Sequence, residues 1–159
     1  MNTADRSVEA LDTALRRRFS FIEMNPEPAK LSTKEFKCTG IDLEALLKAI
    51  NARIEKLLDK DYCIGHSYFM TIKNPQSPLE EIKTIFQNKI LPLLQEYFYG
   101  DWGKILLVIG KEFVETNKNS IKFLSTESYE DFEEYDEKPI YSFTAPSNWT
   151  LDSFKTIYE

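Results

Sequence analysis

The chain has 159 residues, a hydrophobic fraction of 42% and a formal net charge of −6. This length and composition predict a folded chain of one ordinary domain or two small ones, and argue against an intrinsically disordered protein. A surface that binds duplex nucleic acid is normally basic, so the negative charge argues against direct nucleic-acid binding by this chain.

Cysteine content and hydrophobic runs indicate the cellular setting. Cys38 and Cys63 accompany a single histidine, which is too small a set for a structural zinc site or a disulfide framework. The start of the chain lacks the basic stretch and apolar run of a signal peptide, and no apolar run reaches the roughly 18 residues of a membrane helix. We therefore expect a soluble, cytoplasmic protein with reduced thiols, no metal site and no contact with a membrane.

The first predicted elements are a short helix and a strand. Ser7 is a suitable N-cap for a helix over residues 8–17, in which apolar side chains recur at helical spacing. Residues 19–24 are typical of a short apolar strand. The segment 25–28 ends this strand, because its two prolines cannot donate to a sheet.

An amphipathic helix is predicted over about residues 42–59. Its leucines and isoleucines fall on one face, which we expect to be buried. That face comprises Leu43, Leu46, Leu47, Ile50, Ile54, Leu57 and Leu58. The following residues, 62–70, are too short and mixed a stretch to classify by periodicity.

A second helix is predicted to start at Ser77-Pro78-Leu79-Glu80. Serine suits the N-cap, proline the first helical position and glutamate the reciprocal N3 position of a capping box. The helix should run to about Tyr97. Pro92 removes one internal hydrogen bond, which predicts a kink near residues 88–90.

The C-terminal third mixes short elements with an acidic loop. A helix over residues 103–109 should end at Gly110, and a last helix should cover residues 151–158, started by Thr150. An acidic stretch at 127–137 is typical of a solvated loop. Three short β-prone segments lie between the two helices, at residues 113–114, 121–124 and 140–143.

Several of these stretches together resemble the McrB family of AAA+ GTPases, the motor subunits of modification-dependent restriction systems. Met1-Asn2-Thr3-Ala4-Asp5-Arg6-Ser7 and the segment 11–21 resemble the family's signature and its arginine-finger helix. The segments 64–69 (Ile-Gly-His-Ser-Tyr-Phe) and 93–101 resemble parts of its helical lid. The matched stretches span roughly residues 1–110 in the family's order.

The resemblance implies roles for four N-terminal residues. Asn2 would be sensor 1, orienting the attacking water or touching the γ-phosphate, and Asp5 would belong to the GTP signature. Arg17 and Arg18 are the candidates for the finger that completes a neighbouring subunit's nucleotide site, with Arg16 the weaker candidate. A finger stabilises charge on the transferring phosphoryl group and contributes about 10³–10⁵ in rate in GTPases. The residues alone also allow a capped helix with a solvated basic end.

Two residues of the lid bear on a sensor-2 contact. The resemblance raises the hypothesis that His66 contacts nucleotide, whereas a single histidine beside glycine and serine also fits a hydrogen-bonded structural residue. The position before the Ile-Gly-His-Ser-Tyr-Phe stretch is Cys63. The family often carries a basic residue there, so a cationic sensor-2 contact is not predicted for this chain.

The sequence contains no phosphate cradle. Such a cradle needs Gly-x-x-x-x-Gly-Lys-Ser/Thr, and the pairs Gly103-Lys104 and Gly110-Lys111 lack this context. The resemblance implies GTP, or ATP, with Mg²⁺ in the full-length family protein. For this chain we expect no bound nucleotide and no hydrolysis on its own. The family's signature methionine is internal, so a start at Met1 suggests an internal gene start, a split or degenerate gene, or a deliberately shortened chain.

The expected fold is α+β and mostly helical, in three parts. Residues 1–30 would be a remnant of the AAA+ α/β subdomain with sensor 1, arginine finger and last strand, and would be poorly packed or paired with another chain. Residues 36–110 would be the helical lid and 111–159 a tail of unknown role with a small β element. The expected function is to supply these elements in a homo-oligomeric ring motor that works with a nuclease subunit. The alternatives are a non-enzymatic protein-interaction module and, disfavoured by the signature, a MoxR-like chaperone.

Overall fold

The computed structural model describes residues 24–32, 40–72, 77–117 and 138–159. Several expectations fall outside these residues and stay predictions. They concern the helix over 8–17, nearly all of the strand over 19–24, the β-prone piece 121–124 and the acidic stretch 127–137.

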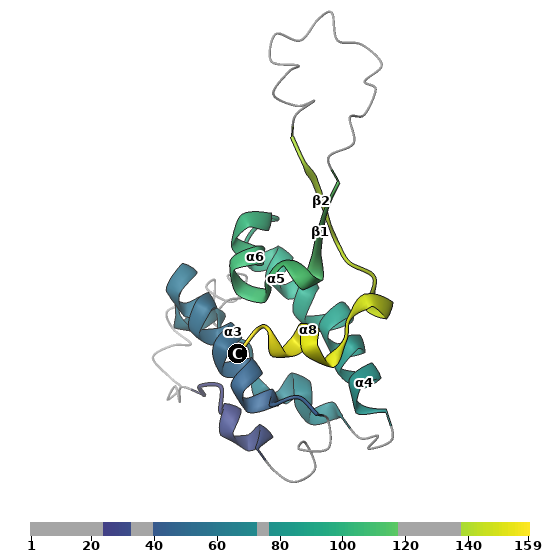
Figure 1. The fold of residues 1–159 in the computed structure, drawn as a ribbon. Coiled ribbons are helices and arrows are strands. Elements are labelled where there is room, and N and C mark those ends of the chain that lie inside the picture. Colours follow the sequence, from purple (N-terminus) through teal and green to yellow (C-terminus); the bar gives the residue numbers. More distant parts are fainter. Residues whose placement is uncertain (1–23, 33–39, 73–76, 118–137) are drawn as a thin grey trace, which may run out of the picture.

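The described chain is a group of helices around one apolar core, with a two-stranded antiparallel hairpin extending away from the helices (Figure 1). This confirms the mostly helical α+β fold. The helices are α3 (Leu43–Leu57), α4 (Pro78–Ile85), α5 (Leu91–Tyr97), α6 (Trp102–Ile109) and α8 (Leu151–Lys155), and the strands are β1 (Val114–Asn117) and β2 (Ile140–Phe143). Within the described ranges no helix is long and apolar enough to cross a membrane.

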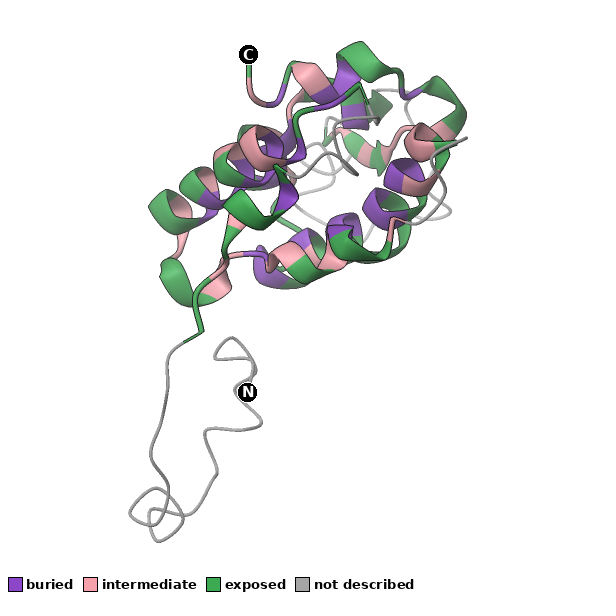
Figure 2. Cartoon of the chain, turned by 90° about the horizontal axis from the view of Figure 1, so that it is seen from below, coloured by how far each residue is buried: buried purple, intermediate pink, exposed green. Residues whose placement is uncertain are grey.

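Helix α3 has the predicted start and buried face. The Asp42 carboxylate caps it by accepting from the backbone N–H of Ala45 at 2.9 Å. Five of the seven predicted apolar side chains are buried, and Leu57 and Leu58 are partly buried at the end of the helix. Figure 2 shows buried residues on the inward side of the helices and exposed ones outside. Each buried leucine or isoleucine contributes about 1.5–3 kcal/mol relative to an exposed one.

Helix α4 begins at Pro78 as predicted, but the capping box is wrong. The Ser77 side chain makes no capping hydrogen bond with any residue that the structure describes. The Glu80 carboxylate instead accepts a hydrogen bond from Nζ of Lys83, one turn later in the helix, at 2.9 Å. Lys83 is 11% exposed at its side chain, so this pairing gives a largely buried cation its counter-charge.

The predicted irregularity of this long helix is a π-helical turn, Phe86–Ile90, between α4 and α5. The backbone N–H of Leu91 donates to the carbonyl of Phe86, five residues earlier. Pro92 lies in the first turn of α5 and cannot donate to a carbonyl of the preceding turn. The wider turn begins two residues before the predicted kink.

In the described residues, three 3₁₀ turns lie before α4. They are η2 (Pro28–Leu31), η3 (Lys60–Tyr62) and η4 (His66–Thr71). The sequence left residues 62–70, which hold most of η4, unclassified, because so short a stretch shows no period. Turn η2 packs against α3 and η4 and buries Leu31 in the core.

Helix α6 leads into the hairpin. It is capped by Asp101 and ends at Gly110, whose φ of +84° suits glycine, so the predicted stop is confirmed. Arg53 of α3 donates to the carbonyl of Val108 at 2.8 Å and so binds α3 to the end of α6. The hairpin pairs Val114 with Phe143. Phe113, predicted to be β, lies in the 3₁₀ turn Lys111–Phe113 instead and is fully buried.

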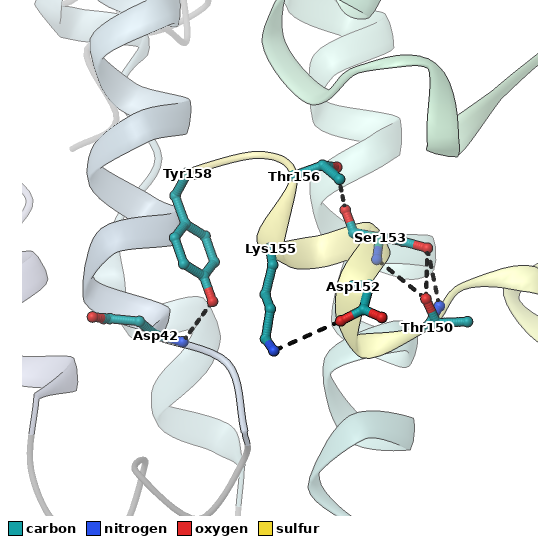
Figure 3. A network of polar contacts seen from close by, with 7 residues as sticks. All are labelled: Asp42, Thr150, Asp152, Ser153, Lys155, Thr156 and Tyr158. Atoms are coloured by element: carbon teal, nitrogen blue, oxygen red, sulfur yellow. Dashed lines mark hydrogen bonds and ion pairs between the residues drawn. The ribbon is translucent and has the colours of Figure 1, made fainter.

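The C-terminal residues complete the core formed by the preceding helices. Trp149, Phe154 and Ile157 are buried there. The Phe154 ring lies 4.9 Å from that of Phe86 and 5.2 Å from that of Phe113, both in edge-on geometry. Thr150 and Ser153 cap the start of α8 reciprocally, as drawn in Figure 3. Helix α8 is shorter than predicted, because residues 156–158 form turns.

Candidate functional site

Of the predicted site residues, the structure describes His66. Asn2, Asp5 and the arginine cluster Arg16, Arg17 and Arg18 lie outside the described residues, so their roles stay predictions. The structure therefore bears on the surroundings of His66.

His66 is the first residue of η4 and faces the segment that precedes α3. The backbone N–H of Glu27 donates to His66 Nδ1 at 3.0 Å. In a neutral imidazole one nitrogen accepts and the other carries the proton, so this bond places the proton on Nε2. His66 is thus a hydrogen-bonded structural residue through its Nδ1 atom. A ligand of the imidazole would have to bind at Nε2.

The Glu27 side chain forms a second contact at this place. Its carboxylate accepts from Lys30 Nζ at 2.8 Å, and both side chains are more than half exposed. The hydrogen bond from Lys30, followed by its charge, holds the pKa of the Glu27 carboxyl below its ordinary value. The ammonium of Lys30 is therefore paired with a carboxylate on its own turn.

The loop that carries His66 is fixed to α3 by Asn51. Its Nδ2 donates to the carbonyl of Ile64 at 2.9 Å, and the N–H of Ile64 donates to its Oδ1 at 2.7 Å. Both residues are buried, so water cannot replace these bonds at low cost. The sequence carries a signal for this pair of hydrogen bonds. Asn51 is a polar residue on the otherwise apolar face of the helix, four residues after Leu47 and three before Ile54.

Cys63 lies in surroundings that do not favour a phosphate. Partial burial raises the pKa of its thiol, and the carboxylates of Glu55, Asp59 and Asp61 raise it further. The thiol therefore stays neutral at neutral pH. Its Sγ donates to the carbonyl of Asn51 at 3.8 Å. Nearby negative charge disfavours an anionic ligand at the position where a basic residue would attract one.

A shallow groove lies beside His66, between η4 and the helix of the π-helical turn. Its volume is about 440 Å³. It is lined by Ser67, Tyr68, Thr71, Thr84, Ile85, Asn88 and Lys89. Helix segments with π-turns frequently carry functional sites, and here the turn supplies Asn88 and Lys89. The groove combines an apolar wall with a single cation.

The described ranges provide no metal centre. No group of three or more His, Cys, Asp or Glu side chains within them could hold a metal ion.

Comparison with known proteins shows which family the helical region resembles. Residues 42–106 match the family described as McrB, alpha-helical lid domain. The chain is also similar to the Type IV methyl-directed restriction enzyme EcoKMcrB subunit of Escherichia coli K12, with 39% identity over 113 residues. This match covers 64% of the chain and 25% of the relative, so the chain spans about a quarter of the length of the curated relative. Residues 42–106 are therefore an α-helical lid of the McrB type, and through it the chain is related to the McrB subunits of restriction systems.

Proposed function

We propose that this chain supplies lid, sensor-1 and arginine-finger elements for GTP hydrolysis in an McrB-like ring motor of a modification-dependent restriction system. The observation that carries the proposal is a lid of the McrB type with the preceding segment folded onto it. Leu31 and the Glu27–His66 hydrogen bond hold that segment against the lid. The described chain thus reaches the lid through residues 24–32, next to the turn that carries His66.

The N-terminal residues would act on a nucleotide that another part of the motor binds. Asn2 would orient the attacking water, and Asp5 would contribute to recognition of GTP. Arg17 and Arg18 would reach the γ-phosphate held by a neighbouring subunit, because guanidinium groups are permanently charged and donate in a fork that matches phosphate oxygens. GTP, or ATP, with Mg²⁺ would be the cofactor of the assembled motor, and a ring of such subunits with a nuclease subunit would be its setting.

The isolated chain should bind nucleotide weakly at most. The sequence has no phosphate cradle, and the lid position that would attract a phosphate holds a neutral thiol among carboxylates. Titration calorimetry of the purified chain with GTP and with ATP, each with Mg²⁺, tests this expectation. Binding at micromolar concentrations would contradict the expectation that this chain supplies only part of a nucleotide site and lacks the phosphate-binding part.

A mixing experiment tests the fingers. The Escherichia coli relative, with its own finger arginines replaced by alanine, is combined with this chain, and GTP hydrolysis is measured. The wild-type chain should restore part of the lost rate, for which the finger effect of about 10³–10⁵ is the upper limit. The double variant Arg17→Ala/Arg18→Ala should restore none of it.

A charge-matched control separates the fingers from general electrostatics. Lys48→Ala/Lys56→Ala removes the same two charges from exposed positions of α3 and should restore hydrolysis as well as the wild-type chain does. Equal stimulation by the arginine and lysine double variants would overturn the finger assignment.

The hairpin supports a second candidate function, a non-enzymatic interaction module. Strands β1 and β2 extend away from the helices, so they present backbone and side chains to a partner protein (Figure 1). Co-elution of this chain with the relative, without any restored hydrolysis, would favour this function over the first.

A further inference from the structure

We infer that His66 is a latch that ties the pre-lid segment, residues 24–32, to the lid through Nδ1. The bond from the Glu27 N–H spans 39 positions of the chain and joins η2 to the first residue of η4. Neither the family match nor the similar relative assigns this role to the histidine. The latch itself does not depend on the proposed function.

The pre-lid segment has two anchors of different kinds. Leu31 is 2% exposed and holds the C-terminal end of the segment in the core. Four residues earlier, Glu27 is exposed at its side chain and is held through its backbone amide. Met24, at the start of the segment, is 90% exposed. A segment that is held in the core at one end needs a further contact to fix its direction, and the Glu27–His66 hydrogen bond supplies one.

The lid side of the latch is rigid. His66 follows Ile64, which Asn51 holds to α3 by two hydrogen bonds, and Phe69 of the same turn is fully buried. The imidazole is therefore presented from a fixed backbone, and its acceptor is positioned before the segment docks. A preorganised acceptor loses little conformational entropy when the bond forms.

The chemistry of the latch requires an acceptor at Nδ1. A side chain that places an acceptor at the same distance from the backbone can replace the histidine, and one that places it further out cannot. Asparagine has its carbonyl oxygen where histidine has Nδ1. Glutamine reaches the position of Nε2 instead. The two amides therefore separate a role of Nδ1 from a role of Nε2 at this residue.

Where the proposed function holds, the latch acts as a positioning element. It sets the direction in which the chain leaves the lid toward Arg17, Arg18 and the nucleotide. This consequence rests on the proposed function. A role of Nε2 in direct nucleotide contact would show the opposite pattern in the mixing experiment, with His66→Gln active and His66→Asn inactive.

Nuclear magnetic resonance on the intact, ¹⁵N-labelled chain tests the latch directly. The chain has one histidine, so its imidazole signals are unambiguous. We expect a scalar coupling across the hydrogen bond between the Glu27 amide nitrogen and His66 Nδ1. Hydrogen exchange at the Glu27 amide should be about 2- to 10-fold faster in His66→Gln, as for the loss of one exposed hydrogen bond. In His66→Asn it should equal the wild-type rate.

The amide of Ile50 in the core of α3 reports global stability and should exchange at the same rate in all three proteins. Absence of the coupling, or equal Glu27 exchange in the two variants, would overturn the latch. Either result leaves the finger assignment of Arg17 and Arg18 untouched, because that assignment is tested by restored hydrolysis.

Discussion

The hydroxyl of Tyr158 accepts a hydrogen bond from the backbone N–H of Asp42 at 3.2 Å, across 116 positions of the sequence (Figure 3). Asp42 is the N-cap of α3, the first helix of the McrB-type lid. The penultimate residue of the chain thus meets the start of the lid. Residues C-terminal to the hairpin are part of the lid's structure, although the match to the lid family ends at residue 106.

Tyr158→Phe tests this contact. The change removes the acceptor and keeps the ring, so the free energy of unfolding should fall by about 0.5–1.5 kcal/mol, the net value of one hydrogen bond. Urea denaturation measures it. Tyr99→Phe, at a side chain that is 87% exposed, is the matched control and should leave stability unchanged. Equal stability of wild type and Tyr158→Phe would show that water replaces the tyrosine at Asp42.

Phe154→Ala tests the contribution of α8 to the core. The side chain is fully buried against the rings of Phe86 and Phe113, so its removal leaves a cavity and should cost about 3–5 kcal/mol. Thermal and urea denaturation should both show the loss, with a single transition for the whole lid. Leu107→Ala, at a side chain that is 64% exposed, should change stability by less than about 0.5 kcal/mol. Two separate transitions would mean that the C-terminal residues fold apart from the lid.

Asn51→Ala tests the clamp beneath the His66 loop. It leaves the buried N–H and carbonyl of Ile64 without partners, each at a cost of about 1–3 kcal/mol, so a total of about 2–4 kcal/mol is expected after relaxation. Chemical denaturation measures the loss, and amide exchange at Ile64 should accelerate beyond the global effect. Asn88→Ala, at an exposed position, is the control and should leave both readouts near wild type.

Asp101 predicts a specific pH dependence of stability. Its carboxylate caps α6, and the backbone N–H of Lys104 is the main cause that lowers its pKa, with the Lys104 ammonium adding to it. A lowered folded-state pKa means that the stabilisation is present above the ordinary value of 3.8 and is lost as the pH falls through the folded-state value. Urea midpoints followed from about pH 6 to about pH 2.5 should show a larger loss for the wild-type chain than for Asp101→Asn.

Lys104→Gln separates the two causes at Asp101. It keeps the backbone donor and removes the ion pair, so most of the pH dependence attributed to Asp101 should remain. If the pH dependence vanished in Lys104→Gln, the side-chain ion pair would be the dominant cause and the capping interpretation would be wrong.

The sequence predicted those parts of the fold whose causes are local. The buried face of α3 follows from the spacing of its leucines and isoleucines. Pro92 marked the π-helical region and Gly110 the end of α6, because each restricts or frees the backbone at its own position. The Ser77 capping box was a local prediction that failed. In the structure the Glu80 carboxylate pairs with Lys83, whose side chain is 11% exposed, instead of turning back to the helix start. Leaving that ammonium without a counter-charge would be costly.

The candidate site was predicted less completely than the fold. The resemblance to the McrB family identified the His66 stretch, and the comparisons confirm the lid that contains it. The partner of His66 could not be predicted, since a backbone amide 39 positions away leaves no trace in residue identity. Asn51 was visible as a polar residue on an apolar face, but its partner, the backbone of Ile64, was not.

The sequence by itself determined the buried face of α3, the start of α4, the end of α6 and the relation to the McrB lid, because periodicity, proline, glycine and short motifs act within a few residues. The tertiary structure alone decided which distant segments meet. It placed Tyr158 at the start of α3, Phe154 between Phe86 and Phe113, and the Glu27 amide on His66. These contacts depend on how apolar faces pack and on which polar groups packing leaves near one another.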